Sequence, residues 1–282
     1  MTFHYWFSIA ILILSSVAAF LIVYRIKKKK ATYFKAPFTT RPRPPGYSLQ
    51  TRTNDLFLDM FQWFFFITLS GLLPFFARQD VFLSWTLSVI SILGIVYCIK
   101  KISEVFKSFE RHNLGLKGEQ LVGMTLDRLS SNEIKVFHDY PVQEKGKKPW
   151  NIDHIVVAPS GVFAVETKTR SKKHYHDDKK GHRVIYENGT LKFPSFEDKH
   201  GLDQAQRQAN SLSDALTDTL VTAIEVNPIL VLPGWYVDRK SKDGIPVVNE
   251  KLIAGVLKGP EKIDKKTRDQ ICRQLERVCV VE

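Results

Sequence analysis

The chain has 282 residues, of which 44% are apolar and 25% charged, with a formal net charge of +12 at pH 7. This length allows one or two domains, and the three cysteines form no CxxC pair, so we expect reduced structural cysteines in a cytosolic setting and not a disulfide framework. Residues 1–99 carry 10 Lys and Arg against 3 Asp and Glu, so most of the positive excess lies in the apolar-rich portion and is weak evidence for nucleic-acid binding.

Three apolar stretches precede residue 100. The uncharged segment 5–24 has the roughly 20 residues that cross a hydrocarbon core, and its positive charges follow it, which favours an uncleaved helix over a signal peptide. Segments 56–76 and 81–99 are the second and third predicted spans, joined by a very short loop. Asp59 is interpreted as a polar residue near a helix end, with an intramembrane site as the alternative.

Charge asymmetry predicts the topology of these spans. The loop 25–55 holds nine Lys and Arg, whereas the loop 78–80 holds one. We therefore expect a multi-pass protein of a bacterial inner membrane, with its N-terminus outside and a cytoplasmic domain over 102–282. The alternative is that 56–99 is a re-entrant or interfacial hairpin. The Pro-rich and basic residues 41–46 predict an extended loop that contacts anionic lipid head groups, with nucleic acid as the alternative partner.

Residues 102–282 have the pattern of an α/β domain with a mixed sheet. The segment 102–111 is expected to continue as a short helix out of the membrane. Another helix is expected over 119–129, with Glu119 in its first turn, where a carboxylate complements the helix dipole. Strands are expected over 134–142, 152–158 and 161–168. A helix over 203–220, a buried strand over 229–232 after Asn227-Pro228, and an amphipathic helix over 265–278 complete the domain.

The hairpin formed by the second and third strands brings polar residues together. If Pro159 and Ser160 form a two-residue turn, Asp153 lies opposite Glu166, and Lys168 lies on the same face. Two opposed carboxylates repel each other, but a hard divalent cation would turn that repulsion into binding. The alternative interpretation is a surface salt bridge of Lys168 with one of the two acids, and the spacing alone does not decide between them.

The Asp153…Glu166-Thr-Lys168 pattern resembles the D…(D/E)-x-K signature of restriction-endonuclease-like nucleases. Together with Gly115-Leu-Lys-Gly118-Glu119 and the block from Gly201 to Leu212, it is similar to the nuclease-related domain family over roughly residues 112–235. The resemblance implies an α/β, restriction-endonuclease-like mixed-sheet domain, here preceded by three transmembrane helices.

The resemblance also implies site residues. Asp153 and Glu166 would bind Mg²⁺, with Mn²⁺ as a substitute, Glu119 would be an accessory ligand, and Lys168 would be the catalytic lysine. Gln204 matches the glutamine of the helix that follows the core strands. The family usually has Asn-Pro shortly before that glutamine, whereas this chain has His200 and Gly201 at these places.

Residues 169–199 form an insertion before that helix. Asn188-Gly189 within it predicts a tight hairpin. Lys172, Lys173 and Arg183 belong to a basic patch that would bind phosphates, with a solvated loop as the alternative. Three histidines and two aspartates between 174 and 182 have no accompanying cysteine, so we do not expect a zinc site there.

These observations lead to the expectation of a membrane-anchored, metal-dependent nuclease that acts on DNA or RNA. Two alternatives are kept: a catalytically silent nucleic-acid-binding or signalling module, and a membrane scaffold that binds protein. Protein partners and homo-oligomerisation are left open.

Overall fold

The computed structural model describes residues 14, 17, 21, 41–77, 80–144, 146, 148–172, 182–241 and 243–281. The chain divides into two compact units. The first comprises Met1–Pro37 and Gln50–Asn113, and the second comprises Phe38–Leu49 and Leu114–Glu282. The short segment that ends at Leu49 is therefore part of the same unit as the C-terminal residues.

Two long apolar helices belong largely to the described part of the first unit. Helix α2 spans Tyr47–Leu72 and passes into a 3-10 turn, η1, at Leu73–Ala77, where Pro74 ends the regular α-helical bonding. Helix α3 spans Val81–Asp127. Both are long and apolar enough to cross a membrane, which agrees with the predictions for 56–76 and 81–99. The predicted span 5–24 lies outside the described residues, apart from residues 14, 17 and 21.

Helix α3 confirms that the segment 81–99 continues into 102–111, and it corrects the sequence prediction of a separate helix over 119–129. The structure has one continuous helix of 47 residues. No proline interrupts it, and each glycine in a helix costs only about 1 kcal/mol, which the surrounding helix-forming residues offset. Glu119 consequently lies well inside a helix and not in its first turn, so the expected interaction with a helix dipole does not apply.

The second unit is built on a five-stranded mixed sheet with the order β10-β8-β4-β3-β2. Its strands are β2 (Lys135–Val142), β3 (Trp150–Ala158), β4 (Gly161–Thr167), β8 (Val226–Val231) and β10 (Val247–Val248). β2, β3 and β4 pair antiparallel, whereas β8 is parallel to both β4 and β10. The predicted strands and the α/β class are confirmed, except that β8 begins earlier than expected and contains Pro228. Proline is tolerated there because β10 pairs only with Leu230 and Val231, which leaves one side of Pro228 unpaired.

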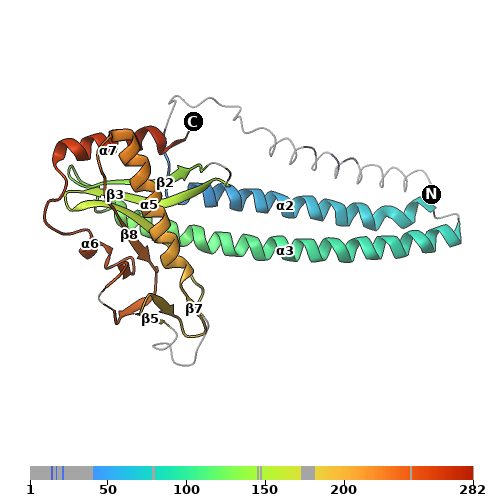
Figure 1. Ribbon diagram of the computed structural model, residues 1–282. Coiled ribbons are helices and arrows are strands. Elements are labelled where there is room, and N and C mark those ends of the chain that lie inside the picture. Colours follow the sequence, from blue (N-terminus) through green and yellow to red (C-terminus); the bar gives the residue numbers. More distant parts are fainter. Residues whose placement is uncertain are drawn as a thin grey trace. The chain divides into compact units, whose positions relative to one another are not determined.

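Helices cover both faces of this sheet. Helices α5 (His200–Leu220) and α7 (Lys265–Val278) pack on one face through a core that includes Ile155, Leu212 and Ile271 (Figure 1). The C-terminal turns of α3, with Val122 and Leu126, and the short helix α6 (Ile253–Val256) contribute to the core on the other face. The predicted helix 265–278 is confirmed at both ends.

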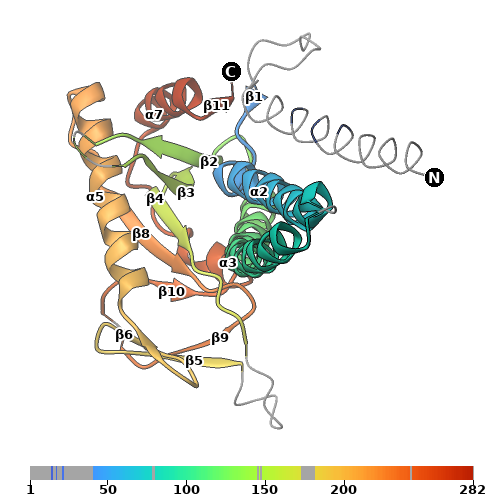
Figure 2. The same ribbon diagram turned by 90° about the vertical axis from the view of Figure 1, so that its right-hand side faces the viewer.

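A second, four-stranded sheet lies next to β10 (Figure 2). Its strands are β5 (Arg183–Glu187), β6 (Thr190–Lys192), β7 (Glu197–Asp198) and β9 (Tyr236–Arg239). Asn188 and Gly189 both have positive φ, 49° and 69°, as a tight hairpin turn requires, so the predicted hairpin is confirmed. The pairing of β5 with β9 was not predicted.

A third pairing joins the ends of the second unit. β1 (Arg41–Pro42) pairs antiparallel with β11 (Val280–Val281). Residues 41 and 42, which the sequence predicted to be loop, are therefore part of a two-stranded ribbon.

Candidate active site

The β3–β4 hairpin places the two candidate acids at one end of the main sheet. The ladder runs from Ala158 opposite Gly161 to His154 opposite Val165, so the next opposed pair is Asp153 and Glu166. The predicted register is therefore correct, and both side chains lie on the same face. Asp153 Oδ2 accepts a 2.7 Å hydrogen bond from the backbone N–H of Thr167, which fixes its carboxylate beside β4.

Glu166 and Lys168 form a buried ion pair. Lys168 Nζ lies 2.6 Å from Glu166 Oε1, and the Glu166 side chain is only 2% exposed. Lys168 Nζ also donates a 2.7 Å hydrogen bond to Gln204 Oε1 on α5. Lys168 thus connects Glu166 with Gln204, and all three are residues that the family resemblance implied for the site.

Gln208 completes this cluster from the next turn of α5. Its Nε2 donates a 2.5 Å hydrogen bond to Glu166 Oε2 and a 3.4 Å bond to the backbone carbonyl of Asn151. Residues four apart share one face of a helix, so Gln204 and Gln208 approach the β4 side chains together. Among the described residues, Gln208 Oε1 is buried and has no hydrogen-bond partner.

Glu119 approaches the cluster from α3 because Gly118 allows close packing. A Cβ added at Gly118 would lie 1.7 Å from Thr169 Oγ1, so only glycine permits the helix to pass this close to the residue after Lys168. Glu119 is 9% exposed. The predicted accessory acid is therefore held near the hairpin by backbone contact.

Burial and neighbouring carboxylates raise the pKa values of Glu119 and Asp153. Burial, followed by the charges of Glu166 and Asp139, raises the pKa of Glu119 to about 8, and Lys168 opposes the shift. Desolvation, Glu166 and Glu119 raise the pKa of Asp153 well above its usual range, although the hydrogen bond from Thr167 opposes them. The raised pKa values show that ionising these acids together is costly in the buried site, and a bound cation would offset that cost.

An open cavity of about 720 Å³ lies beside these acids. Glu119, Asp153, Gln204 and Gln208 contribute to its wall. The remaining lining residues are Ser48, Leu49, Asp139, Glu144, Pro149, Trp150, Asn151 and Arg207. The volume is in the range of small-ligand sites, about 300–1,000 Å³.

The donor atoms of this site are the oxygens of carboxylates and amides, which suit Mg²⁺ or Mn²⁺. In the part of the chain that the structure describes, however, no three His, Cys, Asp or Glu side chains are arranged to hold a metal ion. Glu166 faces Lys168 and Gln208 instead. The chemistry of the donors therefore fits a divalent cation, whereas the present side-chain orientations leave Glu166 in an ion pair.

The predicted nucleic-acid-binding residues do not join this cluster. Lys172 donates a hydrogen bond to the Gly234 carbonyl and lies over the Trp235 ring, and Arg183 pairs with Asp238. Lys173 lies outside the described residues. Lys172 and Arg183 thus have partners within the second unit that sequence analysis did not predict.

Sequence reasoning missed Gln208 and Asp139. The spacing Gln204-x-x-x-Gln208 is a signal that was available, because it places both amides on one helical face. Asp139 gives no such signal. Its backbone has φ 54°, which is rare for a residue other than glycine, and its contacts come from distant parts of the chain.

Comparison with known proteins supports the family resemblance. The model of the nuclease-related domain matches residues 114–233, which include Glu119, Asp153, Glu166, Lys168 and Gln204. An uncharacterised protein of Bacillus anthracis is 43% identical over 54 residues, which are 19% of this chain and 26% of that protein. The matched region thus spans about a quarter of the length of that relative. No solved structure matches the chain.

Proposed function

We propose that the second unit is a divalent-metal-dependent nuclease with a restriction-endonuclease-like fold. The observation that carries the proposal is the contact of Glu166 and Lys168, with Asp153 on the same face and Glu119 close by, beside an open cavity. The match to the nuclease-related domain supports the same chemistry. The substrate class is nucleic acid, DNA or RNA.

Each residue of the site would have a separate role in the reaction. Asp153 and Glu166 would hold Mg²⁺ or Mn²⁺ with Glu119 as the accessory ligand, and the bound ion supplies Lewis-acid polarisation of the scissile phosphate and a more acidic water. Lys168 Nζ, 2.6 Å from Glu166 Oε1, would stabilise the negative charge that develops on the phosphate. Gln204 accepts a hydrogen bond from Lys168 and so restricts the position of Nζ.

The membrane region would anchor this nuclease. The apolar helices α2 and α3, together with the segment 5–24, would form three spans that leave the N-terminus outside and the second unit in the bacterial cytoplasm. The exposure of large apolar side chains on α2 and α3, such as Phe64, Trp85 and Leu93, supports contact with lipid.

The proposal is tested by cleavage with the full-length protein in detergent. Labelled single- and double-stranded DNA and RNA are incubated with Mg²⁺, Mn²⁺ or EDTA. We expect metal-dependent cleavage that falls at least about 100-fold in Asp153→Asn and Lys168→Ala. Asp214→Asn, an exposed carboxylate on α5, and Lys251→Ala, an exposed lysine, are matched controls that keep full activity. Absence of cleavage by the wild type, or equal cleavage by all variants, refutes the proposal.

The second candidate is a module that binds nucleic acid without cleaving it. It is favoured by one observation: Glu166 is satisfied by Lys168 and Gln208, as in a structural ion pair. This candidate predicts binding that weakens steeply with salt, with no turnover under any metal. Filter binding of the same oligonucleotides, performed beside the cleavage assay, separates the two.

A further inference from the structure

Residues 41–49, here called the strap, belong to the second unit, although more than sixty residues of the sequence separate them from the rest of that unit. β1 pairs with β11, and the N–H of Arg43 donates to the Cys279 carbonyl at 3.0 Å. Pro45 packs so closely on α3 that a Cβ at Gly123 would lie 2.4 Å from its ring. The strap is therefore held by backbone pairing at one end and by close packing in its middle.

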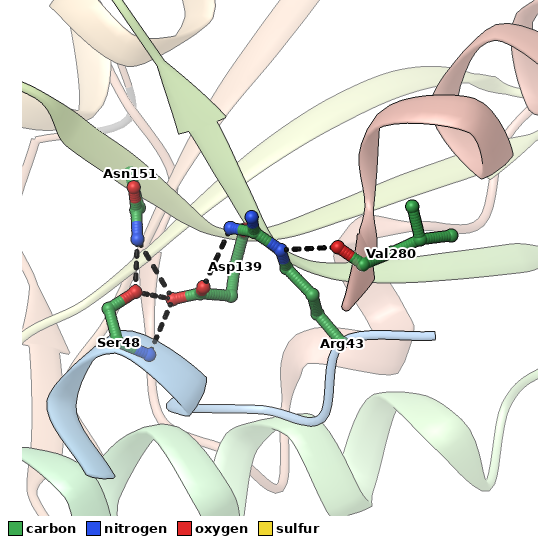
Figure 3. A network of polar contacts seen from close by, with 5 residues as sticks. All are labelled: Arg43, Ser48, Asp139, Asn151 and Val280. Atoms are coloured by element: carbon green, nitrogen blue, oxygen red, sulfur yellow. Dashed lines mark hydrogen bonds and ion pairs between the residues drawn. The ribbon is translucent and has the colours of Figure 1, made fainter. Parts of the chain in front are cut away.

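Arg43 ties the strap to β2 and β11. Its Nε donates to the Val280 carbonyl at 3.0 Å, and its Nη1 donates to the carbonyl of Asp139 at 3.1 Å and to Asp139 Oδ2 at 3.3 Å (Figure 3). Asp139 is 3% exposed and has a positive φ of 54°. This uncommon backbone conformation occurs where one guanidinium contacts both the carbonyl and the carboxylate of the same residue.

Asp139 also forms hydrogen bonds with Ser48 and Asn151. Asp139 Oδ1 accepts from the Ser48 N–H at 3.2 Å, from the Ser48 hydroxyl, and from Asn151 Nδ2 at 3.1 Å. Asn151 Nδ2 also contacts the Ser48 hydroxyl (Figure 3). The side chain of Asn151 is thus fixed from the strap side, two residues before Asp153.

The backbone carbonyl of Asn151 is linked to Glu166 through the side chain of Gln208. This carbonyl accepts from Gln208 Nε2, the same atom that donates to Glu166 Oε2. An unbroken series of polar contacts therefore runs from Arg43 through Asp139, Asn151 and Gln208 to Glu166. Ser48 and Leu49 also line the 720 Å³ cavity, so the strap supplies part of the wall beside the acids.

We propose that Ser48 and Leu49 of the strap form part of the active-site wall and that Arg43 is a positioning residue, which holds Glu166 in place through Asp139, Asn151 and Gln208. This inference rests on the proposed nuclease function. It also gives a reason for joining the domain to the membrane region, because the strap continues directly into the apolar helix α2.

The kinetic test compares two arginines of the strap in the full-length protein. Arg43→Ala is expected to lower kcat about 10-fold with little change in KM, since it disturbs the geometry of the cluster and not substrate contact. Arg43→Lys should recover most of the loss, because an ammonium still reaches Asp139. Arg41→Ala removes the same charge from an exposed neighbour and should leave kcat unchanged. Equal kcat for Arg43→Ala and the wild type overturns the inference.

Hydrogen exchange tests the strap independently of cleavage. Arg43→Ala should speed amide exchange in the peptides that contain Asn151 and Gln208, whereas Arg41→Ala should not. If the wild type does not cleave but this exchange pattern is found, the nuclease proposal fails and the structural coupling stands. Faster exchange confined to residues 41–49 and 280–281 overturns the coupling. Ser48→Ala, which removes one hydroxyl, serves as the second variant if Arg43→Ala does not fold.

Discussion

Glu166 depends on two side chains of different kinds, a lysine from its own strand and an amide from α5. Gln208 is 1% exposed and satisfies the carboxylate oxygen that Lys168 does not reach. Gln208→Leu would leave that oxygen without a partner, so we expect a 10- to 100-fold loss of cleavage rate and a loss of stability of about 1–3 kcal/mol. Initial rates and thermal unfolding measure the two effects.

The matched control for Gln208 is Gln206→Leu. Gln206 is exposed on the same helix and bonds only to Asn210 among the contacts described. The Gln206→Leu substitution should leave both the cleavage rate and the unfolding temperature unchanged. A Gln208→Leu protein that behaves like this control would show that the amide does not support Glu166.

Asp153, Glu166 and Lys168 could be identified from the sequence because they lie close together on one hairpin. A two-residue turn fixes which residues of β3 and β4 are opposed, so counting outward from Pro159-Ser160 is enough to place Asp153 and Glu166. Asp139 could not be found in this way. Its partners Arg43 and Ser48 are 96 and 91 residues away in the sequence, and no periodic pattern encodes such contacts.

The raised pKa of Glu119 predicts how stability depends on pH. The folded protein binds this proton more tightly than the unfolded chain, so the stabilisation is present at low pH and is lost as pH rises from about 4.5 through 8. In EDTA, the unfolding temperature of the wild type should fall over this range, and Glu119→Gln should make the fall smaller.

Scanning fluorimetry between pH 5 and 8.5 measures this effect. Glu133→Gln, at an exposed carboxylate, is the control and should keep the wild-type slope. Mg²⁺ should raise the unfolding temperature more at pH 8.5 than at pH 5, because protons compete less with the ion as the pH rises past the raised pKa of Glu119, about 8. An identical slope in wild type and Glu119→Gln would contradict the assignment.

At the scale of elements, the position of α3 against the end of β4 depends on Gly118. Alanine is normally the better helix former by about 1 kcal/mol. Here a Cβ would lie 1.7 Å from Thr169 Oγ1, so Gly118→Ala should instead destabilise the protein by about 1–3 kcal/mol and reduce cleavage by moving Glu119. A loss of stability, in place of the gain that alanine usually gives in a helix, would show that α3 needs this close approach.

Gly255→Ala provides the comparison for Gly118→Ala. Gly255 lies in α6, and a Cβ there would meet nothing within 4 Å, so alanine should be neutral or slightly stabilising. Unfolding midpoints in urea compare the two variants. A stable, fully active Gly118→Ala protein would show that α3 does not need this close approach.

The elements that the sequence predicted well are those with strong local signals. The hairpin at Asn188-Gly189 and helix α7 are examples, the latter with Asp264 as its N-cap and Ile271 and Leu275 buried. The continuity of α3 through residues 112–118 and the strand β9 were missed for physical reasons. Helix continuity through Gly115 and Gly118 is set by packing on both sides, and β9 exists through its pairing with a distant strand.

At the scale of the whole molecule, the sequence separated an apolar portion from an α/β portion but assigned residues 41–49 to the basic loop of the apolar portion. Apolar helices are recognisable from composition because lipid requires long uninterrupted apolar stretches. The strap has no such signature. Its assignment to the second unit follows from Arg43 and from the pairing of β1 with β11, which spans almost the entire described chain.

The apolar helices predict how the protein behaves in cells. The full-length chain should remain in the membrane fraction after alkaline carbonate extraction, because α2 and the apolar part of α3 are each long enough to span a bilayer. A chain that begins at residue 102 lacks α2, the strap and the span 81–99, so it should be released, and it should cleave more slowly because the wall built by Ser48 and Leu49 is missing.

Reporter fusions after Glu282 distinguish the two sides of the membrane. The excess of Lys and Arg in 25–55 predicts that a fluorescent protein at the C-terminus folds in the cytoplasm and that alkaline phosphatase at the same place stays inactive. Replacing Lys27, Lys28, Lys29 and Lys30 by glutamine weakens that bias and should raise phosphatase activity, whereas glutamines at Lys265 and Lys266, far beyond the spans, should not. An active phosphatase on the wild-type chain would show that Asp153, Glu166 and Lys168 lie outside the cytoplasm. That result would count against nucleic acid as the substrate.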